Sequence, residues 1–188
     1  MMQNGILTRA LTRFGIPLMC LAILSAAPLR AQDAARPVPS EVEANLPKAE
    51  LRGSAQLRWL GFRIYDARLF TSNAAAFDWS SPFALELDYK RGFSRKQLVS
   101  ATGKELTRLE GDQPDQPEIL QKLNTCFNTV VAGDRFVALG AAKDRVDFLF
   151  NGKRTCKLQH PDIRQRVLSI WLSDQARDPK LSRKLRGM

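Results

Sequence analysis

The sequence contains few of the side chains that build metal and nucleophilic centres. Its 188 residues include one histidine, His160, and three cysteines. This inventory excludes a histidine-rich metal centre and a four-cysteine zinc site, and nothing in the sequence supports a metal site built from carboxylates. We therefore expect no metal and no cofactor. A Ser-His-Asp set would have to use His160, which precedes Pro161 at a predicted helix start and is better explained as a surface or capping residue.

Phosphate-binding and nucleic-acid-binding signals are also missing. No Gly-x-Gly-x-x-Gly pattern follows a predicted strand, and Thr102-Gly103-Lys104 lacks the upstream glycine spacing of a phosphate loop. The basic residues are scattered, and no ladder of aromatic residues alternates with them as a base-stacking surface requires. We therefore expect no nucleic-acid partner.

The N-terminus has the pattern of an export signal. Arg9 and Arg13 precede an apolar run at 14–27, which is shorter than the roughly 20 residues that a membrane-spanning helix needs. The pattern predicts a signal peptide at 1–31, cleaved after Ala31, and hence a periplasmic or secreted protein. An uncleaved anchor is the alternative. The proline-containing stretch 32–48 is then expected to be a disordered leader before a folded domain at 49–188.

Export affects the interpretation of both charge and cysteine. Removal of 1–31 lowers the formal net charge from +10 to +7. Two uses of this charge stay open, namely peripheral contact with an anionic envelope surface and simple solvation. The mature chain keeps Cys126 and Cys156, an even pair in an oxidising compartment, which predicts a disulfide. Two buried thiols are the alternative, because the sequence does not show whether the two Cα atoms lie within bridging distance.

The pattern of apolar residues predicts an α+β domain with an antiparallel sheet and helices on one face. Ser94 and Gly111 are placed as the start and end signals of one helix, and Asn151-Gly152 as the turn of a hairpin. Glu86 and Asp88 share one side of a predicted strand, which we expect to face solvent. The predicted strands are 51–70 in two stretches, 83–89, 135–141, 145–150 and 153–158; the predicted helices are 96–109, 118–131 and one beginning at 161.

Arg58 and Tyr65 are candidate ligand-binding residues. Both lie in or beside predicted strands that are dense in apolar and aromatic residues. A guanidinium and a phenol hydroxyl that converge at the bottom of an apolar cavity would bind a carboxylate or an enolate oxygen. The alternative is that Arg58 pairs with an acid such as Glu86 or Asp66 at the surface of the sheet.

Several segments together resemble the bacterial chalcone isomerase-like family. The most specific are GFRIYDARL at 61–69, Ala132 to Arg135 with its Gly-Asp pair, and Ile170-Trp171-Leu172 with Asp178-Pro179 behind it. The similarity runs from about Leu51 to Gly187. It implies an open-faced β-sandwich, in which a large antiparallel sheet packs against a helical layer and a ligand cavity lies between them.

The resemblance implies two functions of different classes. Fatty-acid-binding members of the family use an arginine and a tyrosine for the ligand carboxylate, and Arg58 and Tyr65 best match that order here. The first hypothesis is thus an exported, non-catalytic binder of a small amphipathic or fatty-acid-like ligand. The second is an isomerase, an intramolecular lyase acting on an enone or phenolic substrate, in which the same groups would stabilise an oxyanion. A structural partner of an envelope complex is a third option.

Overall fold

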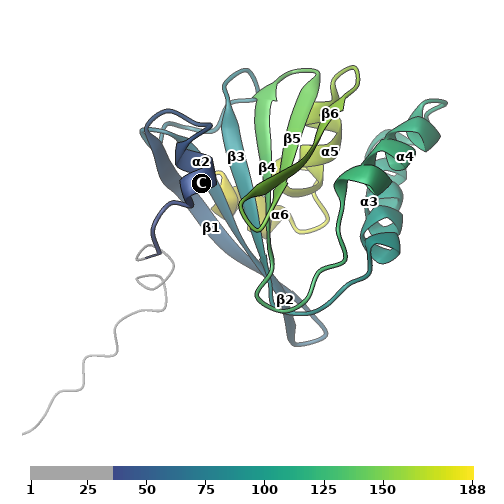
Figure 1. The fold of residues 1–188 in the computed structure, drawn as a ribbon, viewed down its shortest axis with the longest axis horizontal. Helices are drawn as coiled ribbons and strands as arrows, with labels where there is room; N and C mark the ends of the chain where they lie inside the picture. The colour runs from purple at the N-terminus through teal and green to yellow at the C-terminus, as the bar shows by residue number, and fades with distance from the viewer. Residues whose placement is uncertain (1–35) are drawn as a thin grey trace, which may run out of the picture.

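The computed structural model describes residues 36–188, so the predicted signal peptide at 1–31 and the start of the predicted leader lie outside the described residues. Six strands form one antiparallel sheet in chain order (Figure 1). This confirms the predicted α+β open-faced sandwich. The strands are β1 (Ala49–Trp59), β2 (Phe62–Ser72), β3 (Phe83–Tyr89), β4 (Arg135–Ala142), β5 (Arg145–Phe150) and β6 (Lys153–Gln159).

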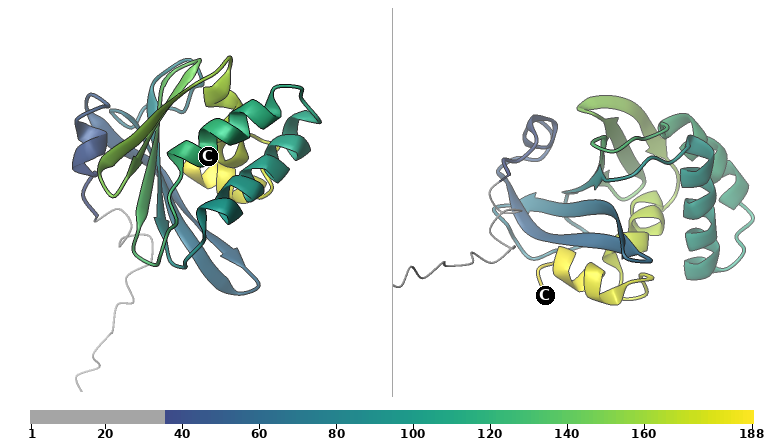
Figure 2. Two further views of the ribbon diagram at one scale, coloured as in Figure 1. Left: turned by 45° about the vertical axis from the view of Figure 1, so that its right-hand side comes forward. Right: turned by 90° about the horizontal axis from the view of Figure 1, so that it is seen from below.

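Helices cover the two faces of the sheet unequally (Figure 2). One face packs against a layer of four helices and forms the larger hydrophobic core, whereas one short helix lies on the opposite face. No helix within 36–188 is long and apolar enough to cross a membrane. The layer consists of α3 (Arg95–Glu110), α4 (Gln116–Cys126), α5 (Ile163–Leu172) and α6 (Pro179–Leu185), and the opposite helix is α2 (Ser40–Glu43).

Local signals set most of the boundaries. The Ser94 side chain accepts a hydrogen bond from the backbone N–H of Gln97 in a capping box. Gly111, at φ 73°, ends α3. The two stretches predicted at 51–70 are joined by a tight turn, with Leu60 and Gly61 at φ 48° and 79°. Helix α4 ends at Cys126, earlier than predicted, because the backbone after it becomes extended and Val130 pairs with Phe93.

The second face of the sheet differs from the prediction. Within the predicted leader, 36–48 is ordered as a strap across this face, and its Val42 and Leu46 are 0% and 2% exposed. They pack on apolar side chains from β2 to β5, and these contacts were not evident from a proline-rich sequence. Glu86 is consequently 1% exposed rather than solvent-facing, because the strap covers it and Arg68 pairs with it.

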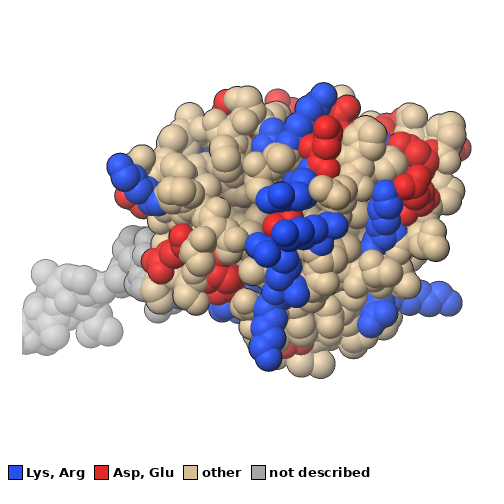
Figure 3. Space-filling model, turned by 45° about the horizontal axis from the view of Figure 1, so that its top comes forward, with Lys and Arg blue, Asp and Glu red and all other residues tan. Residues whose placement is uncertain are grey.

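The surface carries charges of both signs. On the face drawn in Figure 3, lysine and arginine side chains form a band across the middle, with acidic side chains among and beside them. The ion pairs include a link between two helices, in which Arg166 of α5 contacts Asp115 at 2.7 Å and Glu110 at 2.8 Å. The side chain of His160, predicted as a surface or capping residue, is 7% exposed, and its Nε2 lies 2.8 Å from Asp115.

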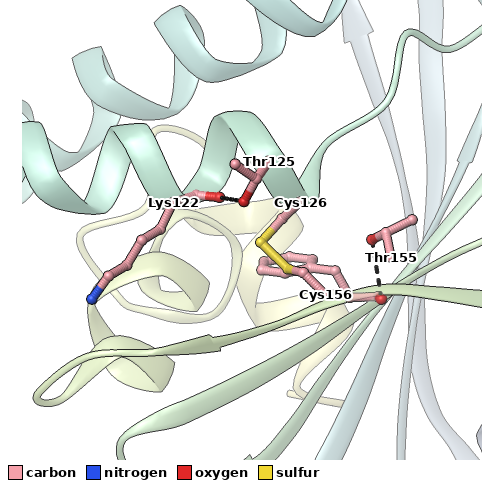
Figure 4. Close-up of a disulfide and its surroundings, with 6 residues drawn as sticks. Lys122, Thr125, Cys126, Thr155 and Cys156 are labelled. Carbon is pink, nitrogen blue, oxygen red and sulfur yellow. Dashed lines mark hydrogen bonds between the residues drawn. A yellow bond between two sulfur atoms is a disulfide. The ribbon is translucent and has the colours of Figure 1, made fainter.

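The predicted disulfide is confirmed. Cys126 at the end of α4 is bonded to Cys156 of β6, and their Cα atoms lie 5.1 Å apart (Figure 4). The side chains around it keep local hydrogen bonds, from Thr125 to the Lys122 carbonyl and from Thr155 to the Phe148 carbonyl. The bond therefore fixes one end of the helical layer to the sheet.

Candidate ligand-binding cavity

A cavity of about 310 Å³ lies between the sheet and the helical layer. Small-molecule sites typically span roughly 300–1,000 Å³, so this cavity suits a small ligand. Its wall is mostly apolar because inward-facing positions of five strands, β1 to β5, meet the inner faces of three helices. The apolar lining includes Leu57, Ile64, Leu85, Leu87, Phe93, Leu98, Phe127, Phe136, Ala138, Phe148, Leu168, Ile170 and Leu181.

Tyr65 provides a polar group in this apolar wall. Its hydroxyl accepts a hydrogen bond of 2.8 Å from the indole Nε1–H of Trp171, which projects from α5. A phenol both donates and accepts, and the Tyr65 hydroxyl proton has no acceptor among the residues of 36–188. Burial raises the pKa of Tyr65 well above its ordinary value of 10, against the smaller opposing effect of the Trp171 hydrogen bond. Tyr65 thus presents a neutral hydroxyl that can donate.

Tyr89 adds a second hydroxyl. It lies opposite Tyr65 in the β2–β3 register, and the two rings meet edge to face with centroids 5.9 Å apart. Tyr89 is 6% exposed, and within the described part of the chain its hydroxyl has no hydrogen-bond partner. Burial raises the pKa of Tyr89 also, and the neighbouring Tyr65 adds to this effect. The Tyr89 hydroxyl proton is therefore available to an acceptor on a ligand in the cavity.

Charged groups stand at the exposed end of the cavity. Glu105 of α3 accepts hydrogen bonds of 2.8 Å from Arg108 and 2.6 Å from Arg177, so its charge is balanced. Asp178 also lines this end, where its side chain caps α6 through the Leu181 amide. Both acids add to the rise in the Tyr65 pKa.

The structure brings only one of the two predicted ligand-binding residues into the cavity. Tyr65 lines it, but Arg58 is exposed near the end of β1 and does not. Arg58 follows Leu57 in β1, and adjacent side chains of a strand point to opposite sides, so Leu57 faces the cavity and Arg58 does not. The predicted alternative partners are taken by other residues, since Glu86 pairs with Arg68 and Asp66 with Arg63.

Three site residues were missed by sequence reasoning. Tyr89 was predicted only as part of a strand, Trp171 only as part of a helix and of the family resemblance, and Arg177 was not considered. The family resemblance at Ile170-Trp171-Leu172 drew attention to Trp171. No local pattern, however, could predict its hydrogen bond with Tyr65, which is 106 residues away. Among residues 36–188, no group of three histidine, cysteine, aspartate or glutamate side chains is placed to hold a metal ion.

Comparisons with known proteins agree with the architecture. The sequence profile of the family described as chalcone isomerase-like matches residues 35–187. Among solved structures, the fold is similar to that of a fatty-acid binding protein of Arabidopsis thaliana, with a TM-score of 0.59 and 10% sequence identity over 75% of this chain and 88% of the other. No curated protein sequence gives a significant match. At this identity the structural match establishes the fold alone.

Proposed function

Because the chain belongs to the chalcone isomerase-like family, we propose that it is an exported, non-catalytic protein that binds a small amphipathic, fatty-acid-like molecule in this cavity. The observation that carries the proposal is an apolar cavity of about 310 Å³ into which two phenol hydroxyls bring unused donor protons. The fatty-acid binding protein with a similar fold supports a ligand of this class.

The lining favours a ligand that is mostly hydrocarbon with one oxygen-bearing end. Apolar side chains give an apolar tail its binding free energy, at about 25 cal/mol per Å² removed from water. Tyr65 and Tyr89 supply donors, so the polar end of the ligand must accept hydrogen bonds. Arg177 is the cation in the described lining, and it stands at the same exposed end, where a carboxylate could share it with Glu105.

Two features support export. The pattern of 1–31 is that of a signal peptide, and the Cys126–Cys156 bond belongs to oxidising compartments. N-terminal sequencing of the protein recovered from the cell envelope is expected to begin at Gln32.

Tyr65→Phe tests the binding proposal. Titration with decanoic acid, followed by calorimetry, is expected to show weaker binding by about tenfold, because the variant loses one hydrogen bond to a charged group. Arg58→Ala is the matched control and is expected to bind like the wild type, since Arg58 lies outside the cavity. Ala101→Trp, at the exposed edge of the cavity, should block entry while leaving the buried core intact.

Two outcomes would overturn the proposal. Wild-type protein that binds neither decanoic acid nor any lipid extractable from the purified material would indicate a structural partner. Turnover of a chalcone by the wild type, lost in Tyr65→Phe, would establish the isomerase instead.

A further inference from the structure

Large apolar side chains are exposed at the tip of the β1–β2 hairpin. Trp59, Leu60 and Phe62 are 67%, 75% and 53% exposed. They surround the tight turn at Leu60–Gly61, and the hairpin projects beyond the rest of the sheet (Figures 1 and 2). A contiguous exposed apolar patch of this kind marks an interaction surface. We call Trp59, Leu60 and Phe62 the apolar tip.

Two arginines border the apolar tip without acidic partners. Arg58 is adjacent to Trp59, and the guanidinium of Arg91 lies 4.1 Å from the ring centroid of Phe62. Neither arginine forms an ion pair within residues 36–188. The nearby carboxylate of Asp66 is already held by Arg63 and Lys90, at 2.6 and 3.2 Å. The tip therefore combines apolar area with uncompensated positive charge.

We propose that this hairpin tip docks on the surface of an anionic lipid bilayer. Tryptophan is enriched at the membrane–water interface, where an arginine can extend its charged end toward the headgroups. Anionic lipids attract each basic side chain near the surface, an effect that weakens as salt rises. A second copy of the tip is a poorer occupant, because pairing two tips would bring their arginines together. The positive charge of Arg58 and Arg91 therefore favours an anionic surface over a second copy of the protein.

The apolar tip adjoins the cavity. A shallow hollow at the tip is lined by Trp59, Leu60, Phe62 and Arg91, and it shares Ile64 and Phe93 with the cavity lining. Ile64 of β2 therefore lies between Phe62 at the tip and the cavity that it also lines. A docked bilayer would lie beside the ligand site. The docking itself does not depend on the proposed ligand, so the two proposals can fail separately.

Co-sedimentation of the purified protein with lipid vesicles tests the docking. We expect binding to vesicles of phosphatidylcholine mixed with phosphatidylglycerol, much weaker binding to phosphatidylcholine alone, and release by high salt. Replacing Trp59, Leu60 and Phe62 by serine should lower binding at least tenfold. Arg58→Ala and Arg91→Ala should each lower it about fivefold, the change that corresponds to the roughly 1 kcal/mol that one basic residue contributes near such a surface.

Matched controls come from exposed residues near the C-terminus, away from the apolar tip. Met188→Ser removes an apolar side chain that is as exposed as Leu60, and Lys180→Ala and Arg183→Ala remove exposed positive charges from α6. These controls should bind vesicles like the wild type. Because the tip side chains are exposed, the serine variant should keep the wild-type thermal midpoint and its affinity for decanoic acid.

Three results would overturn the docking proposal. The first is a wild-type protein that fails to bind anionic vesicles, and the second is a set of tip variants that bind as well as the controls. The third is a wild-type dimer that the serine substitutions convert to a monomer, which would identify a second copy as the occupant. If vesicle binding persists while decanoic acid binding is absent, docking stands and the ligand proposal falls.

Discussion

Arg68 and Glu86 form an ion pair beneath the strap on the second face of the sheet. Their side chains are 4% and 2% exposed, and an Arg68 terminal nitrogen lies 2.7 Å from the Glu86 carboxylate. Burial raises the pKa of Glu86 and lowers the pKa of Arg68, although each partner acts in the opposite direction. Removing either partner of such a pair would leave the other charge buried and unpaired, which costs more than the pair itself contributes.

At this residue scale, a double-mutant cycle gives a prediction. Glu86→Leu should lower the free energy of unfolding by about 3–5 kcal/mol, because it leaves the Arg68 charge buried without its partner. Adding Arg68→Met should recover most of that loss. Denaturant unfolding of the four proteins measures both values, with exposed Glu43→Leu as a control that changes little. A double variant less stable than Glu86→Leu would contradict the prediction.

At the scale of elements, the helical layer is fixed to the sheet at separate points. The disulfide joins α4 to β6, and Arg166 joins α5 to Glu110 at the end of α3 and to Asp115 just before α4. Helix α6 approaches β1 so closely that a Cβ on Gly53 would stand 2.2 Å from the Lys184 carbonyl oxygen. These links set the separation of the layers and hence the cavity between them.

Loss of the disulfide is predicted to destabilise the protein. The bond closes a loop with a sequence separation of 30, which in the chain-entropy model contributes roughly 3–4 kcal/mol. Cys126→Ala combined with Cys156→Ala should therefore lower the unfolding free energy by that amount. Reductant should lower the stability of the wild type to a similar extent and leave the variant unchanged. Equal stability of the oxidised and reduced wild type would refute the prediction.

At the scale of the whole molecule, the sheet has two unequal cores. The larger lies under the four helices and contains the cavity, whereas the smaller is closed by the strap of residues 36–48. Arg135 holds the strap through a 2.6 Å ion pair with Glu41, and Arg36 contacts Asp88 at 2.7 Å. Cleavage after Ala31 would leave this strap in place.

Truncation of the strap is predicted to expose the smaller core. A chain beginning at residue 49 loses buried Val42 and Leu46, each with a burial free energy of about 1.5–3 kcal/mol, and uncovers Phe70 and Leu139. We expect a lower unfolding midpoint and increased binding of a hydrophobic dye. A chain beginning at residue 36 is the control and should resemble the wild type. Unchanged dye binding after truncation at 49 would show that the strap does not protect the core.

Sequence patterns predicted the elements well because the signals involved are local. The Ser94 cap, the Gly111 stop and the Asn151-Gly152 turn each act within a few residues, and all three lie where expected. The alternation of β3 predicted a half-buried strand, but the strap that buries Glu86 comes from a distant segment. No local pattern in β3 could reveal that cover.

The composition and patterning of the sequence by themselves determined the α+β class, the antiparallel strands, the main helices and the family resemblance. They also restricted the disulfide to one pair in a chain that has lost the predicted signal peptide. Only the tertiary structure decided that Cys126 and Cys156 meet, that Trp171 donates to Tyr65, and that Arg58 lies outside the cavity. The physical reason is that strand register, bulges and helix docking depend on contacts between distant segments. In β2, for example, the pairing with β1 skips Ile64, and the adjacent residues Ile64 and Tyr65 both line the cavity.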